Sequence, residues 1–257
     1  LSAAARAAKP AFLVDPRREI DAYRELLAPL GVGPRLYGAD TARGWLFLAR
    51  VPGVELYQIG HPLVWQQVAA WLAGMHHRFA RVHDAGDAPS RLVQYDRQFY
   101  RRFMEHALAR DWPGRAGVAI RRLSAVHDDL VDRLLELPTT ILHGELYASN
   151  VLVDPASERV AVWPVDWEMA AVGPALFDLA ALVAGRWSSG QRALIADAYR
   201  HAGTDGIDGR TFRDALACCR LQLCVQWLGW SESWTPPPQH AHDWLAEACE
   251  LLEEIAW

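Results

Sequence analysis

Apolar residues recur at helical spacing over long stretches of this chain, and shorter apolar runs bounded by turn residues lie between them. The first such pattern predicts a helix over residues 17–27, which Pro29 and the glycines after it should end. Two strands are expected next, over residues 35–38 and 44–51. The second strand should break at Pro52-Gly53, where a hinge is expected.

A strand-rich segment also lies in the middle of the chain. Residues 139–142 are strand-like, and residues 151–153 and 160–162 flank a turn, as in a short hairpin. The other predicted elements are helices, over residues 62–77, 94–110, 119–137 and most of the chain beyond Gly173. We expect an α+β architecture in which residues 1–53 form a small amino-terminal lobe and hinge and residues 54–257 a larger, mainly helical lobe. A functional cleft is expected between the lobes.

The composition is that of a globular protein. The 257 residues are 51% hydrophobic and 22% charged, which excludes a disordered or fibrous chain. The chain has a formal net charge of −5 and therefore lacks the positive electrostatic field that general binding to nucleic acids or anionic membranes requires. Neither kind of partner is expected. The four cysteines form no C-x-x-C pair, which favours a reducing cytoplasm. Cys218, Cys219 and Cys224 should pack in the core.

The strongest chemical signal lies between Ile141 and Val153. A predicted strand leads into His143-Gly144-Glu145, where glycine permits a tight turn, and an amide follows at Asn150. Asp166 lies at the far end of the predicted hairpin, which returns the chain towards Asn150. Phosphoryl transfer needs one carboxylate to orient the attacking hydroxyl, and an amide and a second carboxylate to hold Mg²⁺. For Glu145 and Asn150 alone, an ordinary surface turn is the competing interpretation.

Three motifs together resemble the signature of the aminoglycoside phosphotransferase and choline kinase-like family. They are His143-Gly144-Glu145 with Asn150, then Val165-Asp166-Trp167-Glu168, then Gly173-Pro174 with Asp178-Leu179-Ala180. The resemblance extends over roughly residues 16–185 and includes the strand at residues 46–53 and the helix around residues 72–76. It implies the two-lobed protein-kinase-like fold, ATP or GTP as phosphoryl donor, Mg²⁺ as cofactor and a hydroxyl group of a small molecule as acceptor.

The same resemblance assigns roles around the catalytic turn. Glu145 stands where the family has its catalytic aspartate, and Asn150 and Asp166 match the magnesium ligands. His143 and Asp178 match residues that brace the catalytic loop rather than react.

On the nucleotide side, the resemblance implies four further residues. Glu19 matches the glutamate that pairs with the phosphate-binding lysine, although an ordinary first-turn glutamate is an equally simple interpretation. The backbone of Ala49 and Val51 would pair with the adenine edge, and Leu48 would lie behind the base.

Two features depart from the family's pattern. Glu145 carries one methylene more than aspartate, and a displacement of about 1 Å at a reacting centre can cost about 100-fold in rate. Lys9 is the only lysine, and it is either the phosphate-binding lysine or a solvated terminal residue, since Pro10 beside it fits poorly within a sheet. No Gly-rich loop precedes the first helix, and we expect that loop to lie upstream of Leu1.

These observations leave three functional hypotheses. The first is a phosphotransferase that acts on a small-molecule hydroxyl of the aminoglycoside, sugar or amino-alcohol type. The second, motivated by Glu145 and the missing lysine, is a catalytically impaired kinase-like module that binds a nucleotide or metabolite as a regulator or partner. Metal-dependent hydrolysis is weaker, because the histidines form no H-E-x-x-H pattern. The sequence does not specify an oligomeric state.

Acidic and aromatic residues gather towards the carboxyl end. Glu232, Asp243 and Glu247 either attract a cationic substrate or form a solvated helix face. Most of the twelve tryptophans should lie in the core, and one or two in a cleft are candidates to stack on a sugar or a cation.

Overall fold

The computed structural model describes residues 9–155, 160–185, 187–203, 206–230 and 241–257. Contacts divide the chain into two compact units, each built from separated stretches of sequence. The mixed unit consists of Asp15–Val93 and Thr139–Ile207, and the helical unit of Leu1–Val14, Gln94–Pro138 and Asp208–Trp257. The lobe boundary expected after residue 53 stays a prediction.

The mixed unit begins with one continuous helix. It comprises α2 (Arg18–Asp21), the π-helical segment η2 (Ala22–Leu27) and α3 (Ala28–Leu30). The helix continues past Pro29, one of the residues predicted to end it, because the preceding turn pairs residues five apart and does not require the N–H donor that proline lacks. Gly31, the first of the glycines predicted to end it, does so with a left-handed φ of +63° and a Val32 N–H that donates to the Leu27 carbonyl oxygen at 2.9 Å.

Three small sheets follow in the described part of this unit. β1 (Leu36–Asp40) and β2 (Trp45–Leu48) form a hairpin, in which the second strand ends three residues earlier than predicted. The second sheet has the order β3-β6-β7, with β3 (Val54–Glu55), β6 (Val151–Asp154) and β7 (Ala161–Pro164). In the third, β5 (Thr139–Leu142) pairs with β8 (Ala171–Pro174), and Val93 of β4 (Val93–Gln94) donates to the Ala170 carbonyl oxygen.

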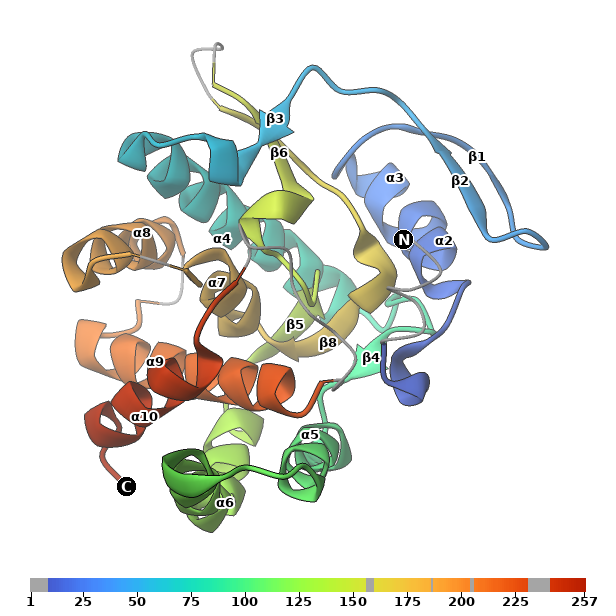
Figure 1. Ribbon diagram of the computed structural model, residues 1–257. Helices are drawn as coiled ribbons and strands as arrows, with labels where there is room; N and C mark the ends of the chain where they lie inside the picture. The colour runs from blue at the N-terminus through green and yellow to red at the C-terminus, as the bar shows by residue number, and fades with distance from the viewer. Residues whose placement is uncertain (1–8, 156–159, 186, 204–205, 231–240) are drawn as a thin grey trace. The chain divides into compact units, whose positions relative to one another are not determined.

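Helices cover these strands within the mixed unit. The elements are η3 (Leu56–Gln58), α4 (Pro62–Asp84), η4 (Ala148–Asn150), η5 (Trp167–Met169), α7 (Leu176–Leu182) and α8 (Ser189–Ala202). Figure 1 shows α4 beside α8, and the two helices pack together. α4 runs seven residues beyond its predicted end, because Phe79 continues the fully buried stripe of Leu72 and Met75.

In its described part, the helical unit packs four long helices around an apolar core. Its elements are η1 (Ala11–Leu13), α5 (Arg97–Ala109), α6 (Gly114–Leu135), α9 (Gly209–Leu228) and α10 (Trp244–Glu254). α9 is the most buried of them, and Cys218, Cys219 and Cys224 are buried in it, as predicted. In the described part of the chain, no helix combines the length and the apolar character needed to cross a membrane.

The end of α9 depends on a glycine that touches another backbone. A Cβ at Gly229 would lie 2.0 Å from the carbonyl oxygen of Phe103 in the same unit. We expect Gly229→Ala to lower the free energy of unfolding by about 2–3 kcal/mol, through overpacking. Gly74, exposed within α4 and with open space around it, provides the matched control. Gly74→Ala should stabilise the protein by about 0.5–1 kcal/mol.

Urea titrations of the two variants and the wild type measure both effects. Equal changes in the two variants would contradict the steric explanation for Gly229.

Candidate functional site

A buried carboxylate holds the turn that follows β5. The His143 N–H donates to Asp178 Oδ2 at 2.8 Å, and the Gly144 N–H donates to Asp178 Oδ1 at 2.9 Å. Gly144 has a φ of +85°, and a Cβ there would lie 2.1 Å from the Met169 carbonyl oxygen. Glycine is therefore required at this position, and the carboxylate sets the direction in which the chain leaves β5.

Asp178, on α7, also accepts a hydrogen bond from α4. Its Oδ2 lies 3.1 Å from His76 Nε2, which must carry a proton because a carboxylate only accepts. The other ring nitrogen of His76 bonds the Tyr199 hydroxyl of α8 at 2.8 Å, and the His76 carbonyl accepts from the Thr140 hydroxyl of β5. Asp178 thus ties the turn to α4, α7 and α8, which is the bracing role implied for it.

His143 connects the same turn to the end of β7. Its Nε2 donates to the Val165 carbonyl oxygen at 2.9 Å, and its Nδ1 accepts from the Glu145 N–H at 3.3 Å. These two roles require a neutral imidazole. Burial lowers the pKa of His143, so the ring stays neutral at pH 7 and serves as a fixed spacer.

Glu145 and Asn150 are drawn together by a compact loop. The Glu145 carbonyl accepts from the Tyr147 N–H at 2.7 Å and from Asn150 Nδ2 at 2.9 Å. The Asn150 N–H in turn donates to the Tyr147 carbonyl at 2.8 Å. The backbone of Glu145 is therefore held through its carbonyl oxygen, and the residue as a whole is half-buried.

The β6–β7 hairpin returns Asp166 to the level of Asn150, as predicted from the spacing. Val151 pairs with Pro164, and the Val165 N–H donates to the Asn150 carbonyl at 2.9 Å. Asp166 has a φ of +66°, the only left-handed φ found outside glycine in the described ranges. Such a conformation costs about 1–3 kcal/mol and is typical of functional sites.

The first turn of α2 holds the residues immediately after Asp166. Glu19 Oε1 accepts from the Trp167 N–H at 3.1 Å. Arg18 is buried, and its guanidinium donates to the carbonyl oxygens of Glu168 at 2.7 Å and Arg91 at 3.0 Å. Glu19 therefore lies against the Asp166 turn, whatever its relation to a lysine.

The structure thus brings Glu145, Asn150, Asp166 and Glu19 to connected segments of one unit. Lys9 belongs to the helical unit, so its pairing with Glu19 stays a prediction.

The expected adenine-binding residues lie at the end of the β1–β2 hairpin and just after it. Leu48 pairs with Leu36, and the Ala49 N–H donates to the Arg35 carbonyl at 2.8 Å. An adenine edge can therefore meet the Ala49 carbonyl or the Val51 backbone here, but not the Ala49 N–H. Their contact with a nucleotide stays a prediction.

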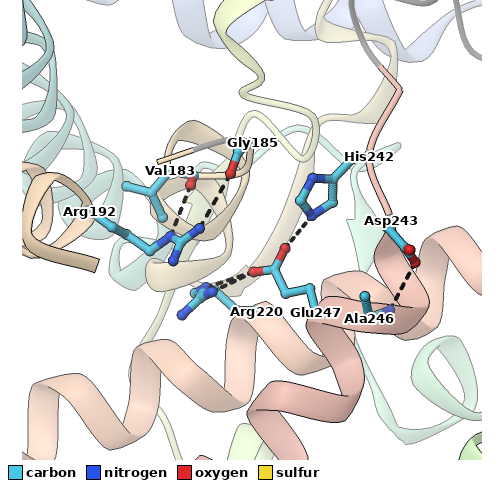
Figure 2. A network of polar contacts seen from close by, with 8 residues as sticks. All are labelled: Val183, Gly185, Arg192, Arg220, His242, Asp243, Ala246 and Glu247. Carbon is cyan, nitrogen blue, oxygen red and sulfur yellow. Dashed lines mark hydrogen bonds and ion pairs between the residues drawn. The ribbon is translucent and has the colours of Figure 1, made fainter. Parts of the chain in front are cut away.

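Of the acidic residues near the carboxyl end, Glu247 has neither role considered for it. Figure 2 shows Glu247 of α10 bonded to Arg220 and His242 within the helical unit. Glu247 is only 7% exposed, and bonds to these two partners lower its pKa to about 2, against the effect of burial. Glu247 is thus neither a solvated residue nor a carboxylate available to bind a cationic substrate. Asp243 caps α10 through the Ala246 N–H, and Glu232 lies outside the described residues.

Sequence reasoning assigned no role in the site to His76, to Tyr199 or to the contacts of Arg18. His76 lies on the apolar stripe of α4, and a polar side chain on a buried face indicates a partner, so a signal for it existed. Tyr199 lies far from its partner His76 in the sequence, and the Glu168 carbonyl lies far from its donor Arg18. No local sequence pattern identifies contacts over such separations.

Solved structures share the fold of this chain. A choline/ethanolamine kinase family protein from Mesorhizobium loti matches with a TM-score of 0.63 and 19% identity, over 96% of this chain and 79% of that one. A choline kinase from Streptococcus pneumoniae matches with a TM-score of 0.66 and 15% identity, over 95% and 82%. An aminoglycoside 2'-phosphotransferase matches with a TM-score of 0.63 and 16% identity, over 92% and 81%. These likenesses confirm the α+β, kinase-like fold class.

Sequence comparison gives the same assignment at the level of the family. No curated protein matches the chain. The family model described as "Phosphotransferase enzyme family" matches residues 5–216, a range that includes all the motifs described above. The chain belongs to the phosphotransferase enzyme family.

Proposed function

We propose that this chain transfers the γ-phosphoryl group of ATP or GTP to a hydroxyl group of a small molecule. The observation that carries the proposal is the placement of Glu145, Asn150 and Asp166 on adjoining turns that one hydrogen-bond network connects. The membership of the phosphotransferase family supports the reaction class. The acceptor is expected to be of the aminoglycoside, sugar or amino-alcohol type.

The residues present fit a magnesium ion bound together with a nucleotide. Asn150 Nδ2 is engaged with the Glu145 carbonyl, so the amide oxygen is the atom that Asn150 offers, and Asp166 adds a carboxylate. In the described residues, no group of three or more His, Cys, Asp and Glu side chains could hold a metal alone. Two protein oxygens suit Mg²⁺, which usually completes its shell with phosphates and water. When bound, Mg²⁺ offsets the phosphate charge during transfer.

The chain's own groups then position the acceptor. Glu145 would accept a hydrogen bond from the acceptor hydroxyl, orient it towards the phosphorus and take up its proton. Neutral His143 accepts a hydrogen bond from the Glu145 N–H, and Asn150 Nδ2 donates one to the Glu145 carbonyl oxygen. Because the backbone is held in this way, the length of the Glu145 side chain determines how far its carboxylate extends towards the acceptor. Catalysis would then rest mainly on orientation and on the charges around the phosphates.

Solved relatives support a purine nucleotide as the donor. The choline kinase was also solved with AMP, and the aminoglycoside phosphotransferase with GDP. In this chain, Leu48 would lie behind the base, and the Ala49 carbonyl and the Val51 backbone would meet its edge. The impaired regulatory module remains the rival, because Glu145 replaces the expected aspartate.

Binding of Mg²⁺-ATP, measured by calorimetry, tests the nucleotide site. Wild type should bind with an affinity that depends on magnesium, and Asp166→Asn should lose most of that dependence because one anionic ligand is removed. Asp214→Asn, the same chemical change on an exposed residue of α9, is the matched control and should bind like wild type. Equal binding by the Asp166 and Asp214 variants would contradict the assignment of the metal site.

Glu145→Asp distinguishes the working enzyme from the impaired module. The backbone of Glu145 is held from both sides, so this change mainly withdraws the carboxylate by one methylene. An enzyme adapted to glutamate should lose about 100-fold in the rate of acceptor phosphorylation. The measurement is transfer of radiolabelled γ-phosphate to a panel of amino alcohols, sugars and aminoglycosides, with Glu145→Gln as the inactive reference. A gain in rate with aspartate would instead support the impaired module.

A further inference from the structure

Tyr23 has a buried hydroxyl group that the fold does not use. The residue lies on the helix formed by α2, η2 and α3, four positions after Glu19, and is fully buried. Among the described residues, no hydrogen-bond partner lies within reach of its hydroxyl oxygen. An unsatisfied buried hydroxyl costs stability, and phenylalanine would fill the same space without that cost.

The Tyr23 hydroxyl lies close to the turn that contains Asp166. Glu19 Oε1, one turn earlier on the same helix, binds the Trp167 N–H. A Cβ built on Gly33 would lie 3.0 Å from the Pro164 carbonyl oxygen and 3.9 Å from the Tyr23 hydroxyl oxygen. The hydroxyl therefore lies beside the end of β7, two residues before Asp166.

The charge around Tyr23 defines what its hydroxyl can do. Burial raises the pKa of Tyr23 well above its usual value, and the carboxylates of Glu19 and Asp166 raise it further. The hydroxyl is therefore protonated at neutral pH and is a hydrogen-bond donor under the influence of two carboxylates.

We propose that Tyr23 is a positioning residue of the magnesium site, and that its hydroxyl donates a hydrogen bond to the Asp166 carboxylate when the cation is bound. Carboxylates that bind metals are generally oriented by donors of this kind. The inference rests on the proposed function, because it requires Asp166 to hold the cation. It explains why a buried oxygen without a partner occupies this place, where phenylalanine would pack as well.

Tyr23→Phe tests the proposal because it removes only this oxygen. The affinity for Mg²⁺-ATP, measured by calorimetry, should fall about 10-fold, as typically follows the loss of an outer partner of a metal ligand. The affinity for ATP in EDTA should not change. The melting temperature of the unliganded variant should equal that of wild type or exceed it by about 2 °C, because an unsatisfied group is removed.

Tyr100→Phe is the matched control. Tyr100 is also fully buried, but it belongs to the helical unit. There, burial and the nearby Cys219 thiol raise the pKa of its hydroxyl. This variant should keep the wild-type affinity for Mg²⁺-ATP.

The outcomes separate the two proposals. If wild type binds Mg²⁺-ATP and Tyr23→Phe binds it equally well, the role of Tyr23 is wrong and the proposed function stands. If unliganded Tyr23→Phe melts several degrees below wild type, the hydroxyl has a structural partner and the inference is overturned. If wild type shows no binding that depends on magnesium, the proposed function fails and the inference fails with it.

Discussion

The buried carboxylate of Asp178 is the interaction on which the candidate site depends. An ionised carboxylate is costly to bury unless donors surround it, and the chain supplies the backbone N–H groups of His143 and Gly144 and the ring of His76. Each donor is placed by a different feature of the fold. The end of β5 places the first N–H, the left-handed glycine places the second, and the buried face of α4 places the ring. The turn that presents Glu145 is thereby fixed through backbone N–H groups and the His76 ring.

Much of the rest of the site is held through backbone atoms. Glu19 binds the N–H of Trp167, Arg18 binds the carbonyl of Glu168, and His143 binds the carbonyl of Val165. Any residue supplies such groups, so the side chains along these turns can diverge while the geometry persists. This explains in physical terms how identities of 15–19% to solved structures coexist with a shared fold.

The sequence predicted the turn and the hairpin around Glu145, Asn150 and Asp166 better than the neighbouring strands, for a physical reason. The spacing of Glu145, Asn150 and Asp166 follows from a turn and a hairpin, which are local structures. The strands β3 and β8 escaped prediction because two to four residues carry no periodicity, and β8 exists only through its pairing with β5. The burial of Glu247 depends on its bond to Arg220, which lies 27 positions earlier in the sequence. No local sequence pattern indicates a contact over that separation. The left-handed Asp166 is likewise a product of its surroundings.

The discontinuous layout of the two units has a consequence for biosynthesis. All segments of the mixed unit precede Asp208, whereas the helical unit requires α9 and α10 at the carboxyl end. A ribosome working from the amino end therefore completes the segments that carry Glu19, Glu145 and Asp166 first. Meanwhile α5 and α6 have been made without the helices that cover their apolar faces. Until α9 and α10 follow, the exposed apolar surface of α5 and α6 makes the nascent chain prone to aggregation.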